Sequence, residues 1–217
     1  MGYIGKTPTP APLTSSDIAA DIINNTHIGD TAISGFDALA TAPADTDEFL
    51  ISDAGVLKRL DASLVGGGGI TEADQWRVTA TGTGTGVFTS NWERNDTTGF
   101  TGIGSAMTQS SGIFSFPSTG IYLVRYYSRG FGSSQQYAGI YMQGGVSGTY
   151  TTLADSFDSA GNNTNYYFNN STESLFDVTN TATHTVRFGV ESSGSVAYDG
   201  NSAQNVTFVT FMRLGDT

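Results

Sequence analysis

The last two thirds of the chain are short runs of alternating apolar and polar residues, separated by Gly, Pro, Asn, Asp and Ser. We expect strands over residues 75–81, 86–94, 112–117, 120–129, 137–143, 149–155, 165–170, 173–179, 184–191 and 205–214. About ten short strands at this spacing favour an antiparallel β-sandwich over a parallel sheet with crossover helices. We therefore predict a mainly β protein with a head domain over residues 71–217 and no long helix in it.

The first part of the chain has a different pattern. Residues 1–15 hold three of the five prolines, and proline fixes φ and removes a hydrogen-bond donor. This stretch should be extended and unable to fold alone. An extended segment can serve as an anchor when it has side chains to bury against a partner, and those side chains are Tyr3, Ile4, Lys6 and Leu13. A tail without a partner is the alternative.

Residues 16–65 open with a small repeat in which isoleucine recurs every five residues, at Ile18, Ile23, Ile28 and Ile33. This spacing fits neither the period of a helix nor that of a strand, so one chain would spread these side chains around its surface. Three chains wound about one axis could bury them together. The alternative is a short amphipathic helix over residues 16–24 with Ser16 as its N-cap. Either structure leaves an apolar stripe that needs a partner.

A hairpin is predicted later in the same region. Residues 48–52 and 56–60 are short apolar runs, and Asp53, Ala54 and Gly55 stand at the turn between them. Two strands alone are marginal in water and should pair with other copies or pack on the head. Four successive glycines follow, and we take residues 66–70 as the linker to the head.

Composition excludes several functions. The net charge is −11 and the nine basic residues are scattered, so we expect no binding to nucleic acid. No apolar run approaches the length of a membrane span, so we expect no membrane insertion. The chain has no cysteine, which excludes disulfides, thiolate nucleophiles and cysteine-bound zinc.

Catalytic chemistry finds little support. The only histidines are His27 and His184, and neither has an identifiable nucleophile or acid beside it in sequence. The glycines of residues 81–86 lack the lysine and following helix of a phosphate-binding loop. We predict no enzyme and interpret the paired acids as solvated loop residues: Asp155 and Asp158, Glu173 and Asp177, Glu191 and Asp199.

No cofactor is predicted, with Ca²⁺ as the alternative. Residues 155–163 offer carboxylate and amide oxygens in a loop that contains glycine, and Ca²⁺ prefers such ligands. Their spacing departs from the EF-hand pattern, and we assign no metal ligands.

The aromatic residues suggest surfaces for recognition and assembly. Tyr137, Tyr150, Tyr166 and Tyr167 stand among Ser, Asn and Gly, which is typical of an adaptable recognition surface. Residues at this spacing could also line a sandwich. Other aromatics are more numerous than one thin sandwich layer usually needs, so we expect part of this set to lie between protomers: Phe88, Trp92, Phe100, Phe114, Phe116, Tyr122, Tyr126, Phe208 and Phe211.

Residues 112–126 resemble the tumour-necrosis-factor and complement-head superfamily, in which a Phe-containing strand, a Pro-x-x-Gly turn and a Gly-Ile-Tyr strand follow in this order. Residues 205–216 resemble the last core strand of that fold. The resemblance implies a jelly-roll sandwich assembled as a homotrimer and used for recognition or scaffolding.

Residues 1–65 resemble the start of virion proteins from tailed phages of aquatic bacteria. This resemblance implies a non-enzymatic structural protein on the capsid surface or the tail, anchored to a capsid, portal or tail-adaptor protein. The head would then act as a capsid decoration (cement) protein or a short fibre. The alternative is a tail-associated receptor-binding protein that recognises a host surface glycan or protein.

Overall fold

The computed structural model describes residues 14, 41, 43–44, 46–65, 69–133, 136–159 and 166–217. The chain divides into two compact units, Met1–Gly67 and Gly68–Thr217, and the division falls within the run of four glycines. The predicted anchoring residues Tyr3, Ile4, Lys6 and Leu13 lie outside the described residues. The same is true of Ile18, Ile23, Ile28 and Ile33, so their roles stay predictions.

The first unit contains the predicted hairpin. Strand β1 (Glu48–Asp53) pairs antiparallel with β2 (Val56–Asp61), and a short 3-10 helix, η2 (Ala62–Leu64), follows. Ala54 and Gly55 at the turn have φ angles of 50° and 84°. Positive φ at both central residues gives the turn a twist that matches the strands it joins. The sequence therefore located both strands and the turn correctly.

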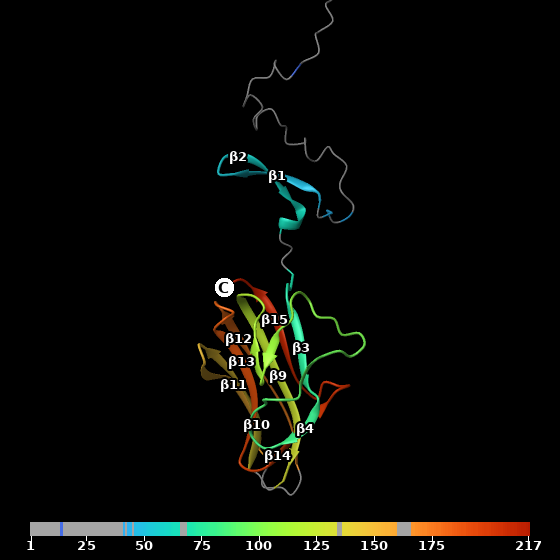
Figure 1. The fold of residues 1–217 in the computed structure, drawn as a ribbon, viewed down its shortest axis with the longest axis vertical. Coiled ribbons are helices and arrows are strands. Elements are labelled where there is room, and N and C mark those ends of the chain that lie inside the picture. Colours follow the sequence, from blue (N-terminus) through green and yellow to red (C-terminus); the bar gives the residue numbers. More distant parts are fainter. Residues whose placement is uncertain are drawn as a thin grey trace, which may run out of the picture. The chain divides into compact units, whose positions relative to one another are not determined.

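The second unit, the head, is built from two antiparallel sheets (Figure 1). The sheet of seven strands has the order β4-β14-β9-β15-β3-β6, with β12 also paired to β9. The sheet of six strands has the order β11-β10-β13-β8-β7, with β5 also paired to β13. The bounds are β3 (Ala73–Val78), β4 (Ala80–Thr83), β5 (Gly86–Val87), β6 (Trp92–Arg94), β7 (Thr108–Ser110), β8 (Ile113–Ser115), β9 (Gly120–Gly132), β10 (Tyr137–Val146), β11 (Thr149–Ser159), β12 (Tyr166–Val178), β13 (His184–Ser192), β14 (Val196–Asn201) and β15 (Thr207–Gly215).

Strand β9 organises the seven-stranded sheet. It pairs with β12 along its whole length, and it also pairs with β15 and β14. Its alternate residues, among them Tyr122, Val124 and Tyr126, are almost fully buried, because side chains alternate between the faces of a strand. The intervening residues face outward.

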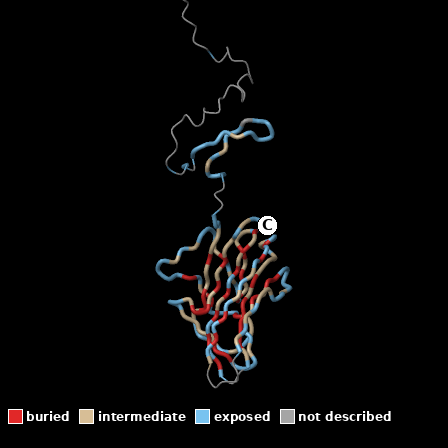
Figure 2. The backbone as a smooth tube through the Cα atoms, turned by 180° about the vertical axis from the view of Figure 1, so that it is seen from behind, coloured by how far each residue is buried: buried red, intermediate tan, exposed pale blue. Residues whose placement is uncertain are grey.

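One aromatic core fills the space between the sheets. Figure 2 shows the buried positions concentrated in the head, whereas none of the described side chains of the hairpin is buried. The ring of Phe114 is fully buried and meets the rings of Trp92 and Phe211 at centroid distances of 5.0 and 5.4 Å. Most of the aromatics that we assigned to a protomer interface are buried in this core: Phe88, Trp92, Phe114, Phe116, Tyr122, Tyr126 and Phe211. For these seven residues the expectation was wrong, because their rings pack edge to face or tilted and fill a single core, whereas Phe100 and Phe208 lie outside it and are partly exposed.

Two predicted strand boundaries were also wrong. Residues 165–170 and 173–179 belong to one continuous strand, β12. The inward positions Asn170 and Thr172 are polar, which interrupts the apolar pattern without ending the strand. Conversely, residues 86–94 form β5 and β6, which belong to different sheets. The chain crosses between the sheets near Asn91, which has a φ of 63°.

Two charged residues are buried in the head with their partners. The Asp74 carboxylate, 4% exposed, accepts hydrogen bonds from Trp76 Nε1, the Met107 amide and Arg94 Nε. Arg77 is fully buried and donates to the side chains of Asn95, Thr97, Glu93 and Asp96. Burying a charge is costly unless it is paired, so these contacts hold residues 93–107 against β3.

Candidate functional site

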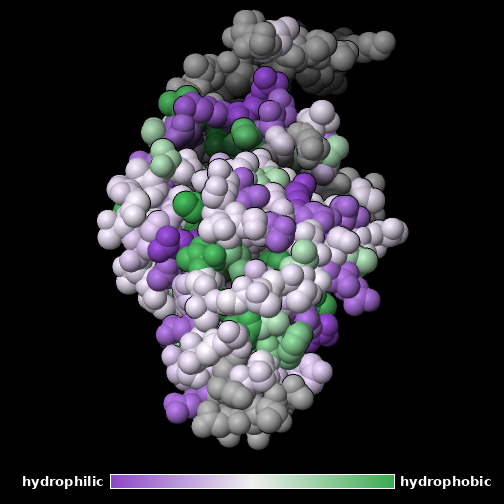
Figure 3. All heavy atoms as spheres, turned by 60° about the horizontal axis from the view of Figure 1, so that its bottom comes forward, coloured by the Kyte–Doolittle hydropathy of each residue, from purple (hydrophilic) through white to green (hydrophobic). Residues whose placement is uncertain are grey.

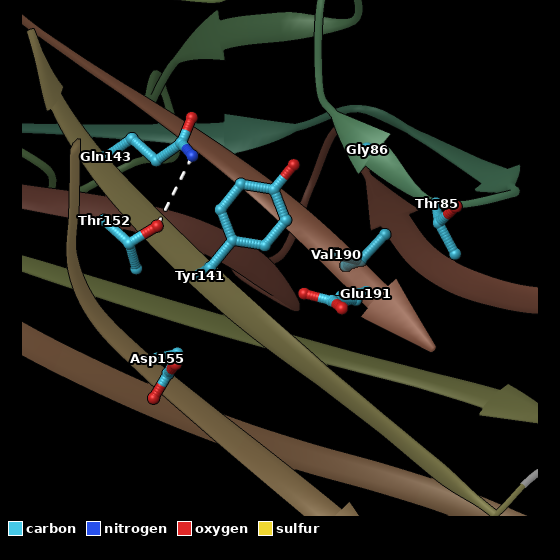
Figure 4. Close-up of a pocket in the computed structure, with 8 residues that line it drawn as sticks. All are labelled: Thr85, Gly86, Tyr141, Gln143, Thr152, Asp155, Val190 and Glu191. Atoms are coloured by element: carbon cyan, nitrogen blue, oxygen red, sulfur yellow. Dashed lines mark hydrogen bonds between the residues drawn. The ribbon is translucent and has the colours of Figure 1, made fainter. Parts of the chain in front are cut away.

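A polar groove lies on the outward face of the six-stranded sheet (Figure 4). It has a volume of about 380 Å³ and runs across β10, β11 and β13 to the edge formed by β5. The side chains that matter for its chemistry are Thr85, Tyr141, Gln143, Thr152, Asp155 and Glu191. Figure 4 shows the Tyr141 ring at the centre, with Glu191 and Asp155 on different sides of it. We call this region the β10 groove.

Aromatic rings cover three glycines on this face. A Cβ atom on Gly189 would lie 2.4 Å from Tyr141 Cζ, and one on Gly139 would lie 2.3 Å from Phe157 Cδ1. A Cβ on Gly145 would lie 2.6 Å from Tyr150 Cε1. Real Cβ contacts are essentially never this short, and backbone oxygens at 2.6 and 2.3 Å also block a Cβ on Gly189 and Gly139, so a larger residue at these positions would displace the ring or the strand. The rings therefore lie against the sheet, and Tyr141 forms the floor of the β10 groove.

A chain of contacts holds the amide of Gln143 in place. The Arg187 guanidinium lies 3.7 Å from the centroid of the Tyr150 ring, where a cation–π interaction fixes it. Arg187 Nε donates to Gln143 Oε1 at 2.8 Å, and Gln143 Nε2 donates to Thr152 Oγ1 at 3.4 Å. Because Arg187 can only donate, the amide oxygen of Gln143 must face Arg187 and its NH₂ group must face the groove.

The two carboxylates of the β10 groove remain available to a ligand. Within the described residues, neither Asp155 nor Glu191 forms a hydrogen bond or an ion pair. Both residues are exposed. Tyr141 pairs with Asp155 on β11 and with Gly189 on β13, while Glu191 pairs with Gly139. The two acids thus stand on opposite sides of β10, and each could accept hydrogen bonds from a ligand that spans the Tyr141 ring.

The phenol of Tyr141 is kept protonated. Burial raises its pKa above the ordinary value of 10.0, Arg187 opposes this shift, and the Glu191 carboxylate adds to it. A phenol in this state donates its proton to an acceptor at neutral pH. The β10 groove therefore offers a flat ring, a donor from Tyr141, a donor from Gln143 and two free carboxylates.

A second surface lies on the outward face of the seven-stranded sheet. Its exposed apolar residues are Phe131, Tyr167 and Leu175, which are 45%, 79% and 61% exposed. Leu175 pairs with Leu123, which pairs in turn with Met212, so three apolar side chains form a row across β12, β9 and β15. We call this region the β9 face.

The β9 face also carries paired aromatic and charged side chains. The rings of Tyr127 and Phe208 lie 5.3 Å apart, and those of Phe131 and Tyr167 lie 6.2 Å apart. Between the Leu175 row and the rings, Arg125 Nη2 forms an ion pair with Glu173 at 2.8 Å. This face therefore combines exposed apolar and aromatic side chains with an ion pair, and aromatic residues are enriched at interfaces between protein subunits.

Exposed apolar side chains are otherwise dispersed on the head. Figure 3 shows one side of the molecule, where separate apolar patches interrupt a mostly hydrophilic surface. Single exposed apolar residues of this kind are normal on a folded protein. The β9 face differs because its apolar residues are neighbours in the strand register.

The four tyrosines predicted for recognition occupy different surroundings. Tyr137 and Tyr150 lie half-buried on the six-stranded sheet, and Tyr137 meets the Phe157 ring edge to face at 5.6 Å. Tyr166 packs against the core, and its hydroxyl is buried. Tyr167 is the most exposed of the four and belongs to the β9 face. The structure thus brings Tyr137 and Tyr150 to one sheet but does not bring all four together.

The predicted acid pairs lie on strands, not in loops. Glu173 pairs with Arg125, and Asp199 pairs with Arg129 at 2.8 Å. Asp158 accepts a hydrogen bond from the Asn169 amide. Among the residues that the structure describes, no group of three or more acidic, histidine or cysteine side chains could hold a metal ion. Residues 160–163 of the predicted calcium loop lie outside that part of the chain.

His184 has a structural environment. Its ring nitrogens lie within hydrogen-bond distance of Thr179, Thr183 and the Asn180 carbonyl, and its ring packs near Phe176. No carboxylate approaches it among the described residues. These contacts fix the turn before β13. Separately, none of the described helices is long and apolar enough to cross a membrane.

Sequence reasoning noticed the acids of the β10 groove but not the groove itself. The sequence places Asp155 and Glu191 in separate pairs, and the four tyrosines predicted for recognition do not include Tyr141. The missed signal was glycine inside strands, at Gly139 and Gly189. Glycine in a strand interior often marks a place where a ligand or another group comes close.

No protein-family model matches the sequence, and no curated protein matches it either. Solved structures with a similar fold include murine APRIL at pH 5.0, with 14% identity, a TM-score of 0.50, and coverage of 66% of this chain and 98% of that chain. Eiger TNF from S. frugiperda has 11% identity, a TM-score of 0.51, and coverage of 67% and 93%. The head is therefore a TNF-like jelly-roll β-sandwich, which confirms the predicted fold. Identities this low show the fold alone.

Proposed function

We propose that the protein is a non-enzymatic structural protein of a tailed-phage virion, with a homotrimeric head and an N-terminal anchor. The β9 face is the observation that carries the assembly part of this proposal. Leu175 and Tyr167 are 61% and 79% exposed there, and burying them against another copy would remove apolar surface from water. TNF-like folds commonly form homotrimers, and the fold of this head is of that type.

The hairpin supports anchoring through further copies or a partner. Phe49, Leu50 and Val56 are 40%, 73% and 58% exposed, so the hairpin buries little of its own apolar surface. A two-stranded ribbon of this kind gains stability when it is covered. Together with the leader resemblance of residues 1–65, this favours a decoration protein of the capsid or a short fibre.

The assembly part is tested by light scattering on the full chain. A trimer has three times the mass of the 22.7 kDa chain. The variant Leu175→Glu places a charge in the β9 face and should yield monomers that keep their β circular-dichroism spectrum. The control is Val146→Glu, which changes an exposed residue of β10 and should leave the trimer intact. A wild-type monomer, or a trimer unaffected by Leu175→Glu, would contradict the proposal.

The anchoring part is tested on particles. Deletion of residues 1–13 should leave a folded trimer that is no longer incorporated. Antibody-gold labelling of the head on intact particles then separates the two placements. Label over the whole shell indicates capsid decoration, and label confined to the tail indicates a fibre. Retained incorporation after the deletion would overturn the anchor.

The second candidate is a tail-associated receptor-binding protein. The observation that favours it is the β10 groove, which offers an aromatic floor and uncommitted hydrogen-bonding groups. The β9 face and the β10 groove belong to different sheets, so assembly through one leaves the other sheet free to bind.

A further inference from the structure

We infer that the β10 groove binds an uncharged saccharide, with one sugar ring stacked on Tyr141 and its hydroxyl groups donating to Asp155 and Glu191. This inference deepens the receptor-binding candidate by naming a ligand class and a site. It depends on neither the anchor nor the trimer, because every lining residue belongs to the six-stranded sheet of one head or, for Thr85, to the residue directly before its strand β5.

The floor of the groove has the shape that a sugar ring requires. Tyr141 lies across Gly189, where a Cβ atom would collide with the ring at 2.4 Å. The ring therefore covers Gly189, and because Tyr141 is only partly buried and lines the groove, part of its surface remains open to a ligand. The face of an aromatic ring carries partial negative charge and attracts the weakly positive C–H groups on one side of a pyranose.

The strands on both sides of Tyr141 supply polar groups for the hydroxyl groups of a sugar ring. Asp155 and Glu191 are acceptors only, and neither has a hydrogen-bond partner among the described residues. A saccharide carries several hydroxyl donors at the edge of its ring and can satisfy both acids while it covers Tyr141. Figure 4 shows the Glu191 side chain beside the Tyr141 ring and Asp155 on the other side of β10, farther from the ring.

The donors of the groove are already oriented. Arg187 is fixed on Tyr150 and holds Gln143 Oε1 at 2.8 Å, which directs the Gln143 NH₂ group toward Thr152 and the groove. A side chain held in this way loses little freedom when it binds, so its hydrogen bond to a ligand contributes more to affinity. The Tyr141 phenol, protonated at neutral pH, is the second donor.

Charge selects the class of saccharide. Two free carboxylates line the groove, and the chain as a whole has a net charge of −11. Arg187, the cation that contacts the groove residue Gln143, is already engaged by Tyr150 and Gln143. Like charges placed together repel, so ligands with carboxylate, sulfate or phosphate groups should bind poorly.

The test is saturation-transfer NMR and calorimetry on the full chain, with matched pairs of saccharides. Lactose is compared with 3′-sialyllactose, and methyl glucoside with glucuronic acid; maltose, cellobiose and chitobiose extend the neutral set. We expect millimolar binding of at least one neutral saccharide and at least tenfold weaker binding of the acidic member of each pair. Ethanolamine is included as a cation without a sugar ring.

Variants then locate the site. Asp155→Asn and Glu191→Gln should each weaken binding about tenfold or more, since each removes a charged acceptor. Tyr141→Val should abolish binding, whereas Tyr141→Phe keeps the floor and should weaken binding only severalfold. Asp177→Asn is the matched control, because it neutralises an exposed acid on β12 in the other sheet.

Each remaining outcome decides against the inference. No binding by any neutral saccharide, or full binding by Tyr141→Val, excludes the site. If the acidic saccharides bind as tightly as the neutral ones, the carboxylates do not select against negative charge. If only ethanolamine binds, the groove is a cation site and not a saccharide site. The mass and melting temperature of each variant are measured on the same sample, so loss of the trimer or of the fold is distinguished from loss of the ligand.

Discussion

The hairpin and the head are both antiparallel β-structure, but they are stabilised in different ways. In β9, alternate residues from Gly120 to Gly132 are buried between two sheets. In β1 and β2, no described residue is buried, and exposed ion pairs such as Arg59 with Glu48 accompany the strand pairing. The difference teaches that the turn and the strand register can specify a hairpin, whereas a core is needed to stabilise it. The head supplies its own core, whereas the described residues of the hairpin form none.

The largest loss of stability should come from a substitution at the centre of the head core. Phe114→Ala removes a fully buried ring that contacts Trp92 at 5.0 Å and Trp76 at 5.6 Å. The expected loss is about 3–5 kcal/mol in the free energy of unfolding, because the cavity cannot close completely. Urea unfolding followed by tryptophan fluorescence measures it, since both tryptophans of the chain lie in the head. The matched control is Phe49→Ala in the hairpin, which should leave this transition unchanged at equal protein concentration.

A smaller loss is expected for the buried guanidinium of the head. Arg77→Met removes hydrogen bonds to Glu93, Asp96 and Asn95, and should cost roughly 2–3 kcal/mol. Arg59→Met in the hairpin also breaks an ion pair, but the Arg59 side chain is 77% exposed, and we expect less than about 1 kcal/mol. Thermal unfolding of the two variants compares them. Equal melting temperatures would show that burial adds nothing to the Arg77 contacts.

Alkaline pH should affect the head through Tyr122. Burial, together with the hydrogen bond to Glu72, raises the pKa of Tyr122 from 10.0 to about 12. The folded state thus holds the phenol proton more tightly than the unfolded chain. The resulting stability is fully present below pH 10 and is lost as the pH rises from 10 to 12.

The variant Tyr122→Phe tests this assignment. It should lower the free energy of unfolding by about 1–2 kcal/mol at neutral pH, because the hydrogen bonds to Glu72 and Ser118 are lost. It should also reduce the decrease in stability between pH 10 and pH 12. Unfolding curves recorded across this range measure both effects, and an unchanged alkaline decrease would assign it to other groups.

The smallest change in the stability of the head should come from a substitution in the exposed hairpin. Leu50 is 73% exposed, so Leu50→Ser should change the unfolding free energy of the head by no more than about 0.5 kcal/mol. Sedimentation of the same sample measures whether assembly weakens. A clear destabilisation of the head by this substitution would mean that the hairpin contributes to the head core.

The sequence predicted those features that depend on local pattern. The hairpin followed from apolar runs around Asp53, Ala54 and Gly55, and the jelly roll followed from turn spacing and the residues around Pro117. Strand β12 was divided in error because buried polar residues such as Asn170 break the alternation.

The two candidate surfaces could not be predicted, because each depends on strand order. The β10 groove joins residues from Thr85 to Glu191, and nothing local to either residue shows that β5 and β11 flank the same sheet. The buried aromatics were misassigned for the same reason. The sequence alone does not distinguish an aromatic residue that fills the core from one that lies between protomers, because the distinction depends on where the second sheet packs.

The division of the head into two sheets also has a mechanical consequence. The glycine linker enters the head at β3 in the seven-stranded sheet, whereas the β10 groove lies on the six-stranded sheet. A tether pulled from the linker against a ligand held in the groove would therefore load the hydrogen bonds of β3 and the aromatic core in series, because the force must cross from one sheet to the other. Interlocked rings such as Phe114, Phe188 and Phe211 would bear that force together.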